Sequence, residues 1–414
     1  MPDAPGELSP ITRSYLLCLN ITCYRDDRGV HYFDPLWHKD LIQHARYLKD
    51  LTLASPCRPG EPPPDAMAWT PSLPPIQFVD LPLSNNTLQA ILHLPSTAVR
   101  LWAAIGRAGI VHLGLTGWPI PFAWVASPFA ALRSKFSVVI VESAPWRLRP
   151  GLPVNWKTRV RAKLFETLGR WCVNRSNLVI MTQEEYRRSL LTARPDRAHI
   201  IHASWLDEEL ILSPAEAEAS WASKRLASGG PTLKLLFAGR LERSKGVLLM
   251  LDAIPLAVRE GVPVELNILG RGELESECRR ACERLQGVAK VSMLGVAPYD
   301  SSFFAILRSH HAVVVPSLSD EQPRIVYDAF SQAVPVLASD TPGLRDCVRH
   351  GSTGRLITGG PSNWAAQIKW CFEHPNELER MGRTGLETAR WMTHEEMHRR
   401  RWRLLVEMLE GRPG

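Results

Sequence analysis

The feature that most constrains the fold is an alternation of short apolar runs and helical patterns along most of the chain. Twelve such runs occur in the 414 residues. They are continuously apolar, which is typical of strands in a parallel sheet that is covered on both faces. Twelve candidate strands separated by helices favour two doubly wound sheets over one. The sequence therefore predicts an α/β protein with two parallel-sheet domains.

The predicted elements fall into two groups along the chain. The earlier strands are Tyr15–Ile21, Thr52–Ala54, Gln77–Leu81, Ile110–Leu115, Ser137–Val141, Asn177–Met181 and His199–His202. The later strands are Lys234–Ala238, Val264–Leu269, Lys290–Leu294, Ala312–Pro316 and Pro335–Ser339. A helix is predicted over Val247–Arg259, and loops over the proline-rich Pro56–Pro75 and over Ala219–Thr232. We place the first domain at residues 1–205, the second at 206–390, and a C-terminal helix that returns to the first domain at 391–414.

Composition and charge narrow the class of protein. Apolar residues make up 45% and charged residues 22% of the chain, which excludes a disordered chain, a fibrous repeat and a disulfide scaffold. The net charge of +7 favours an anionic partner such as a nucleotide, a phosphorylated lipid or a membrane surface. The eight cysteines include no CxxC pair and no zinc-type spacing with histidine. We therefore expect buried thiols in a reducing compartment and no metal site.

No segment is predicted to cross a membrane or to direct secretion. The first residues, MPDAPGELSP, contain no apolar core, so we expect no signal peptide. The longest stretch without Asp, Glu, Lys or Arg is Ala108–Leu132, but Pro119, Pro121 and Pro128 interrupt it. We interpret it as a buried strand, a loop and a short helix. An apolar loop that touches a membrane stays an alternative.

The strongest motif is GRLERSKG at Gly239–Gly246, between an apolar strand and a helical pattern. Gly239 allows a sharp turn at the strand's end. Arg240 and Lys245 then lie at the carboxyl edge of a parallel sheet, where open α/β folds bind ligands. A forked guanidinium and a point-charge ammonium together suit a diphosphate. A solvated basic turn is the alternative.

A second motif, DEQPRIVYD, spans Asp320–Asp328 after the strand AVVVPS. Pro323 suits the first turn of a helix, and a helix amino end attracts phosphate. The N–H groups expected there belong to Arg324, Ile325 and Val326. Asp320 and Asp328 can accept hydrogen bonds from hydroxyl groups, or can be a plain helix cap and a solvated residue. A third motif, GRGELE at Gly270–Glu275, has two of the three glycines of a dinucleotide fingerprint and is weak alone.

Taken together, these segments resemble the retaining glycosyltransferases of family four, which have the "glycosyl transferases group 1" domain and the GT-B fold. The segments GRLERSKG, NILGRGELE, SMLGVAPYD and VVVPSLSDEQPRIVYDAFSQAVPVLASDTPGLRDCVRHGSTGRLI carry the resemblance over Leu233–Glu379. It implies a GT-B protein, with two Rossmann-like domains facing a cleft. The first domain would bind the acceptor and the second the nucleotide sugar.

The resemblance also implies roles for individual residues. Arg240 and Lys245 would bind the diphosphate of the donor, and Asp320 and Asp328 would lie near the hydroxyls of the sugar and the ribose. The residues implied beside the nucleotide and its phosphates are Gly239, Gly270, Gly295, Arg324, Ile325 and Val326. The family's two glutamates are aspartates here, which affects donor identity more than activity. In the first domain Glu142 stands where the family often has a histidine; it is a catalytic candidate or a structural carboxylate.

The expected mechanism follows from the charge of the leaving group. Loss of a nucleoside diphosphate exposes negative charge, which Arg240, Lys245 and the helix amino end at Arg324–Val326 would stabilise. GT-A enzymes use a metal held by a DxD motif, which this sequence lacks. We therefore expect metal-independent transfer without a cofactor, and the resemblance implies retention of configuration.

A basic segment, Arg147–Arg175, holds eight of the basic residues and one acid, Glu166. Apolar residues recur at helical spacing within it, at Trp156, Val160, Leu164, Leu168 and Trp171. Such a helix can lie on anionic lipid or face an anionic acceptor, or it can pack on the core with a solvated face. No motif for nucleic-acid binding accompanies the charge.

The sequence thus predicts a cytoplasmic transferase, with peripheral binding to the inner face of a membrane as an open alternative. It would move a hexosyl or related sugar from a nucleotide sugar to a glycan, a lipid-linked or another hydroxyl acceptor, in polysaccharide or glycoconjugate synthesis. Two alternatives stay open: a catalytically degenerate nucleotide-binding protein and a nucleotide-sugar epimerase of the same shape.

Overall fold

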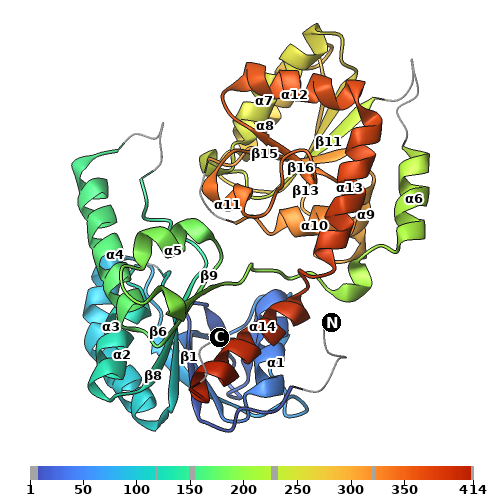
Figure 1. Ribbon diagram of the computed structural model, residues 1–414. Coiled ribbons are helices and arrows are strands. Elements are labelled where there is room, and N and C mark those ends of the chain that lie inside the picture. Colours follow the sequence, from blue (N-terminus) through green and yellow to red (C-terminus); the bar gives the residue numbers. More distant parts are fainter. Residues whose placement is uncertain (1–7, 118, 149–153, 225–231, 319–321, 412–414) are drawn as a thin grey trace. The chain divides into compact units, whose positions relative to one another are not determined.

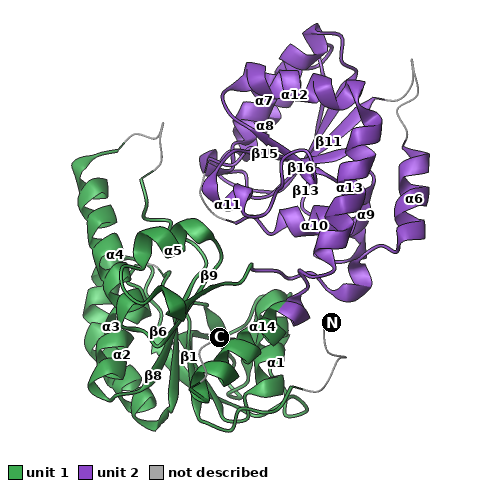
Figure 2. Ribbon diagram, viewed as in Figure 1, with its two compact units in different colours: residues 1–202, 397–414 green, residues 203–396 purple. Residues whose placement is uncertain are grey.

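The computed structural model describes residues 8–117, 119–148, 154–224, 232–318 and 322–411. The chain forms two compact units, residues 1–202 with 397–414 and residues 203–396 (Figure 2). Each unit is an α/β sheet with helices on its faces (Figure 1).

The sheet of the first unit has the order β10-β9-β8-β7-β1-β4-β2-β3-β5, and β6 also pairs with β4. Its strands are β1 (Tyr15–Cys18), β2 (Cys23–Arg25), β3 (His31–Phe33), β4 (Leu51–Pro59), β5 (Met67–Ala68), β6 (Ile76–Pro82), β7 (Ile110–Gly114), β8 (Phe136–Val141), β9 (Leu178–Met181) and β10 (Ala198–Ile200). Its helices are α1 (Pro35–Tyr47), α2 (Thr87–Arg107), α3 (Phe122–Leu132), α4 (Trp156–Arg175), α5 (Glu184–Leu190) and α14 (His394–Leu409), the last starting in the second unit.

Both faces of this sheet are buried, as the continuous apolar runs predict. Along β1, Leu16 and Cys18 pack into one core and Tyr15 and Leu17 into another. Helices α2 to α5 cover the first core, and α1 and α14 cover the second. Because each of these strands is buried on both faces, its residues are apolar throughout and do not alternate between apolar and polar.

The second unit has a six-stranded sheet in the order β13-β12-β11-β14-β15-β16, with each pair parallel. Its strands are β11 (Leu233–Ala238), β12 (Val264–Leu269), β13 (Lys290–Gly295), β14 (Ala312–Val315), β15 (Val336–Ser339) and β16 (Gly354–Ile357). Its helices are α6 (Pro214–Ser223), α7 (Val247–Arg259), α8 (Glu275–Arg284), α9 (Ser301–Arg308), α10 (Ile325–Ser331), α11 (Pro342–Arg345), α12 (Pro361–Glu373) and α13 (Pro375–Ala389).

In both units the strand order reverses at one point. In the second unit the chain builds outward from β11 to β12 and β13, then returns to place β14 on the other side of β11. In the first unit the same reversal lies between β1 and β7. Crossovers leave in opposite directions from such a point, so a crevice opens there at the carboxyl ends of the strands.

All twelve predicted strands are present, and the predicted helix over Val247–Arg259 is α7. Two loop predictions were partly wrong. Residues of Pro56–Pro75 form the end of β4 and all of β5; Pro59 is the last residue of β4, and β5 (Met67–Ala68) contains no proline. Within Ala219–Thr232, the first five residues complete α6, which a capping box at Ser213 initiates.

The first sheet also has an antiparallel extension that the sequence analysis missed. Strands β2 and β3 form a hairpin, and β3 pairs antiparallel with β5. The Asp26 side chain accepts hydrogen bonds from the N–H groups of Arg28 and Val30 and so closes the turn. These strands are only two or three residues long, too short to give a periodic signal.

Glycines set how closely the strand ends approach in the second unit. Gly270 follows β12 with φ +150°, and a Cβ added there would overlap the carbonyl oxygen of Gly239, which follows β11. The Gly239 N–H donates to Leu269 O (2.9 Å), and the Gly270 N–H donates to Gly295 O (2.6 Å). Backbone contacts therefore join the ends of β11, β12 and β13.

We predict that Gly270→Ala destabilises the second unit through this backbone overlap. The loss in free energy of unfolding should exceed that of Gly287→Ala by about 1–3 kcal/mol, a typical cost of overpacking. Gly287 is a matched control, since it also has positive φ (+77°) but has nothing within 4 Å of its added Cβ. Urea denaturation of both variants measures the difference, and equal losses would contradict the predicted overlap.

Candidate functional site

A cavity of about 430 Å³ lies at the point in the second unit where the strand order reverses. It is lined from the end of β11, from the end of β14 and from the loop before α10. The lining residues are Phe237, Ala238, Gly239, Arg240, Lys245, Val314, Val315, Ser317, Gln322, Pro323, Arg324 and Ile325. Of the residues predicted to bind the donor, five line it together: Gly239, Arg240, Lys245, Arg324 and Ile325.

Three cations from two separate loops converge on this cavity. Arg240 pairs with Glu242 (Nη1–Oε1 2.8 Å), but its side chain stays 68% exposed. Lys245 ends a short 3-10 turn, Arg243–Lys245, just before α7. Arg324 stands at the start of α10. Arg240, Lys245 and Arg324 are the charged side chains of the described lining, and all three are basic, which suits a diphosphate.

The loop that carries Lys245 is held against the end of β14. Gly246 has φ +73°, and a Cβ there would overlap the carbonyl oxygen of Pro316. The backbone N–H of Leu318 and the hydroxyl of Ser317 both donate to Ser244 O, at 2.9 and 3.3 Å. The glycine and these two bonds hold the backbone on both sides of Lys245 close to the end of β14.

Two residues that the sequence analysis missed hold the opposite wall. The Gln322 amide accepts from the Ala203 N–H (2.9 Å) and donates to Ala203 O (3.1 Å). The Arg324 guanidinium lies 4.9 Å from the centre of the Trp205 ring, a cation–π contact. A single sequence gives no signal for these contacts, because the partners are more than a hundred residues apart.

The remaining predicted donor residues lie elsewhere or outside the described chain. Asp320 lies outside the described residues. Val326 is fully buried, does not line the cavity, and directs its N–H to Pro323 O (3.3 Å). The prediction that this N–H faces a phosphate is therefore not supported, because the backbone already supplies its acceptor.

Asp328 also departs from its predicted place. It is buried, does not line the cavity, and accepts a hydrogen bond from the Tyr299 hydroxyl (2.7 Å). Burial and this carboxylate raise the pKa of Tyr299, so the phenol is protonated and donates. The carboxylate that was predicted to bind ribose hydroxyls therefore already accepts a hydrogen bond from the Tyr299 phenol. Gly270 and Gly295 likewise do not line the cavity but shape the strand ends beside it.

The first unit has a cavity of about 400 Å³ at its own reversal point, between the ends of β1 and β7. It is lined by Asn20, Thr22, Pro56, Pro82, Leu83, Ser84, Asn85, Ala90, Leu94, Thr97, Gly117, Pro119, Ile120, Phe122 and Val125. Amides, hydroxyls and apolar groups alternate, and none of these residues is ionisable. The two cavities therefore occupy equivalent places in the two sheets but differ in charge.

Glu142 directly follows β8, at the carboxyl edge of the first sheet. Its carboxylate lies 3.5 Å from the guanidinium of the buried Arg401 of α14, and its carbonyl accepts from the Thr182 hydroxyl (3.1 Å). It lines neither cavity. This placement favours the structural alternative for Glu142 over the catalytic one.

The basic helix α4 leaves an apolar stripe exposed. Trp156, Val160 and Leu164 are 70%, 59% and 50% exposed and share a face, because residues four apart lie one above the other on a helix. At about 100° per residue, basic side chains flank this stripe on both sides. These exposed residues are Lys157 and Arg161 on one side, and Arg159 and Lys163 on the other. The helix packs on the core through Ala162, Gly169, Cys172 and Val173 instead.

Among the described residues, none of the helices is long and apolar enough to span a bilayer.

The chain is similar to known proteins both in sequence and in fold. Residues 232–374 match the family described as "Glycosyl transferases group 1". A D-inositol 3-phosphate glycosyltransferase of Pseudarthrobacter chlorophenolicus is 31% identical over 159 residues, which cover 37% of each chain. A phosphatidyl-myo-inositol mannosyltransferase of Mycobacterium leprae is 32% identical over 150 residues, 34% of this chain and 38% of the relative. The alignments thus span under half the length of these two relatives.

The fold extends the likeness to both units. The structure of HepE from Anabaena in complex with UDP superposes with a TM-score of 0.65 at 15% identity, covering 95% of this chain and all of that one. At this identity the superposition establishes the fold, which is the GT-B fold predicted from the sequence. The chain therefore has the GT-B fold, and residues 232–374 of its second unit are similar to the glycosyl transferases group 1 family.

Proposed function

We propose that this protein transfers a sugar from a nucleoside-diphosphate sugar to a hydroxyl acceptor. The observation that carries the proposal is the convergence of Arg240, Lys245 and Arg324 on a cavity at the reversal point of the second sheet. Relatives named as glycosyltransferases support the reaction class, and the relative named a mannosyltransferase supports a hexosyl donor. Retention of configuration rests on the family resemblance of the motifs.

The cations would act on the leaving group. As the bond between sugar and diphosphate breaks, negative charge develops on the phosphate oxygens. Charges already fixed at the cavity wall stabilise it without reorganisation. Arg240 presents a fork of donors and Lys245 a point charge, so together they can bind two phosphates. Gln322 and Trp205 act as positioning residues, since they hold the loop that carries Arg324.

The cavity of the first unit is proposed as the acceptor site. Its amides and hydroxyls suit sugar hydroxyls, and Phe122, Val125 and Leu94 suit an apolar ring face or chain. Because its lining is uncharged, a phosphate within it would lack a counter-charge. The part of the acceptor that enters is therefore neutral, and any phosphate of a lipid-linked acceptor lies outside the cavity.

We predict that Arg240→Ala and Lys245→Ala each lower kcat/KM about a hundredfold or more. Removing one charge-assisted contact to a developing phosphate charge costs roughly 2–4 kcal/mol. The matched control is Arg243→Ala, because Arg243 belongs to the same turn but pairs with Glu277 (3.8 Å) and does not line the cavity.

The assay begins with a thermal-shift screen of UDP-, GDP- and ADP-sugars, followed by transfer or hydrolysis of the labelled donor that binds. Unchanged kinetics in both folded variants would refute this site. Donor binding without turnover would favour the degenerate nucleotide-binding alternative. Interconversion of nucleotide sugars without an acceptor would favour the epimerase.

We also predict that turnover needs no divalent cation. Three basic side chains can supply the charge that a metal supplies elsewhere, and the sequence has no DxD motif to hold one. Adding Mg²⁺ or Mn²⁺ to protein freed of both ions should leave kcat unchanged. Turnover that appears only with one of these ions would contradict the proposed mechanism.

The exposed stripe of α4 is proposed to dock on anionic lipid, as a peripheral contact at the inner face of a membrane. An apolar stripe between two basic rows suits insertion to the depth of the head groups, with the cations beside lipid phosphates. Each basic residue near such a surface contributes about 1 kcal/mol. A contact of this kind would bring a lipid-linked acceptor to the first unit.

We predict that the protein sediments with phosphatidylserine-containing liposomes at low salt and is released at 1 M salt, where the Debye length falls to about 3 Å. Lys157→Ser with Arg159→Ser should weaken binding by about 2 kcal/mol, roughly 30-fold. Arg280→Ser with Arg284→Ser removes the same charge from the exposed side of α8 and should have little effect. Failure to sediment at low salt, or equal loss in both double variants, would rule out docking through α4.

A further inference from the structure

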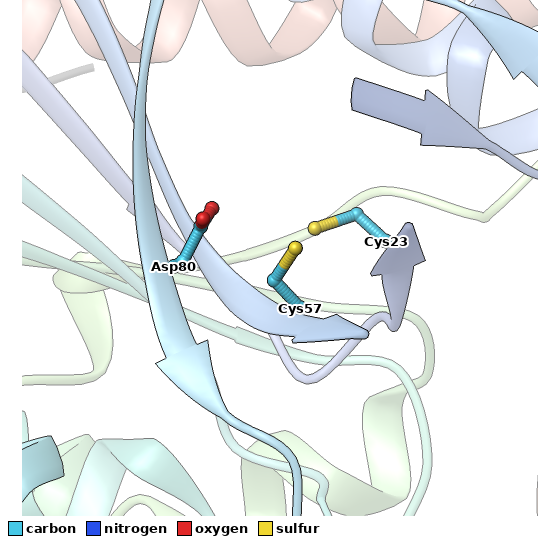
Figure 3. Close-up of side chains that lie close together, drawn as sticks. All are labelled: Cys23, Cys57 and Asp80. Carbon is cyan, nitrogen blue, oxygen red and sulfur yellow. The ribbon is translucent and has the colours of Figure 1, made fainter. Parts of the chain in front are cut away.

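A cluster of potential metal ligands lies in the first unit, apart from the donor cavity. Cys23 of β2, Cys57 of β4 and Asp80 of β6 each offer one atom, and these atoms all lie within 4.8 Å of one another. Figure 3 shows the two sulfurs directed toward each other, with the carboxylate beside them. Both cysteines are buried, and Asp80 is partly exposed.

The sheet itself fixes this arrangement. Strand β4 lies between β2 and β6, and Cys23 stands directly opposite Cys57 in the parallel register. Asp80 stands opposite Ser55, two residues from Cys57 and therefore on the same face. Three donors thus come from three adjacent hydrogen-bonded strands, whose backbones cannot move apart without breaking the sheet.

The spacing suits a zinc ion. With Zn–S near 2.3 Å and Zn–O near 2.0–2.2 Å, the edges of a zinc tetrahedron are about 3.5–3.8 Å. Donor atoms within 4.8 Å of one another reach that geometry with small side-chain adjustments. Thiolates with a carboxylate select zinc over magnesium or calcium, which prefer oxygen alone.

The surroundings complete the charge balance. Two thiolates and a carboxylate carry three negative charges, and Zn²⁺ with Arg25 carries three positive ones. Arg25 Nη1 lies 2.7 Å from Asp80 Oδ2, and His31 Nε2 lies 2.8 Å from Asp80 Oδ1. The His31 ring is fixed by stacking on Phe78 (4.1 Å between ring centres). A carboxylate keeps lone pairs after accepting two such bonds, so Asp80 can still bind a metal.

We propose that Cys23, Cys57 and Asp80 bind a Zn²⁺ ion, with solvent as the fourth ligand and with Arg25 and His31 orienting the carboxylate. Thr22 and Pro56 directly precede Cys23 and Cys57 in the chain, and Pro82 lies opposite Cys57 in the register of β4 and β6. All three residues line the cavity of the first unit. The ion would join the three strands that form this wall.

A disulfide between Cys23 and Cys57 is the competing use of the same pair. It would leave Asp80, Arg25 and His31 without a role in the cluster. The presence of three donor atoms, with Arg25 paired to the carboxylate, therefore favours a metal ion over a disulfide.

The test uses the whole chain and Co²⁺ as a spectroscopic substitute for zinc. We expect freshly purified protein to contain zinc by mass spectrometry, and metal-free protein to gain a thiolate-to-cobalt charge-transfer band with Co²⁺. Cys23→Ser, Cys57→Ser and Asp80→Asn should each lose or strongly weaken the band. His31→Gln, which removes an orienting bond, should lower metal affinity about 10–100-fold.

The matched control is Cys278→Ser with Cys282→Ser, which removes two thiols four residues apart in α8 and should leave the band intact. Circular dichroism establishes that each protein is folded. If a cysteine variant fails to fold, the wild-type band and Asp80→Asn decide the question. Folded wild type without the band, a band that persists in the Cys23 and Cys57 variants, or a Cys23–Cys57 disulfide in fresh protein would overturn the proposal. None of these outcomes depends on whether the protein transfers sugar.

Discussion

The reversal of strand order between β11 and β14 is the constraint on which the proposed chemistry depends. It opens a crevice at the carboxyl ends of two neighbouring strands, because the crossovers leave in opposite directions. Gly270 and Gly246 then let backbones approach closely enough to fix the loops at that edge. Arg240, Lys245 and Arg324 owe their common direction to this edge rather than to contacts with each other.

The same constraint operates in the first unit with a different result. Its reversal point, between β1 and β7, opens a cavity lined by amides, hydroxyls and apolar groups. One topology therefore provides two cavities, and the residues at the strand ends decide what each can bind. An anion fits the basic cavity, whereas the uncharged one suits a neutral group, a division that matches a charged donor and a hydroxyl acceptor.

Periodicity predicted most of the fold because both sheets are covered on both faces. The continuous apolar runs predicted twelve strands, and the apolar pattern of Val247–Arg259 predicted α7 to the residue. Strand β16 (Gly354–Ile357) was missed. The hairpin of β2 and β3 was missed since strands of three residues carry no period. The cluster of Cys23, Cys57 and Asp80 has no spacing signature, because its members meet only across strands. The placements of Val326 and Asp328 depend on hydrogen bonds to Pro323 and Tyr299, which motif matching does not reveal.

The central claim is that the basic cavity of the second unit binds a nucleoside diphosphate. Hydrogen exchange of the whole chain, with and without UDP, GDP or ADP at saturation, tests it most directly. We predict slower exchange in residues 237–246 and 322–327 with the diphosphate that binds, and little change in residues 15–25 and 110–117 of the first unit. Binding that protects other segments and leaves residues 237–246 and 322–327 unchanged would contradict the claim.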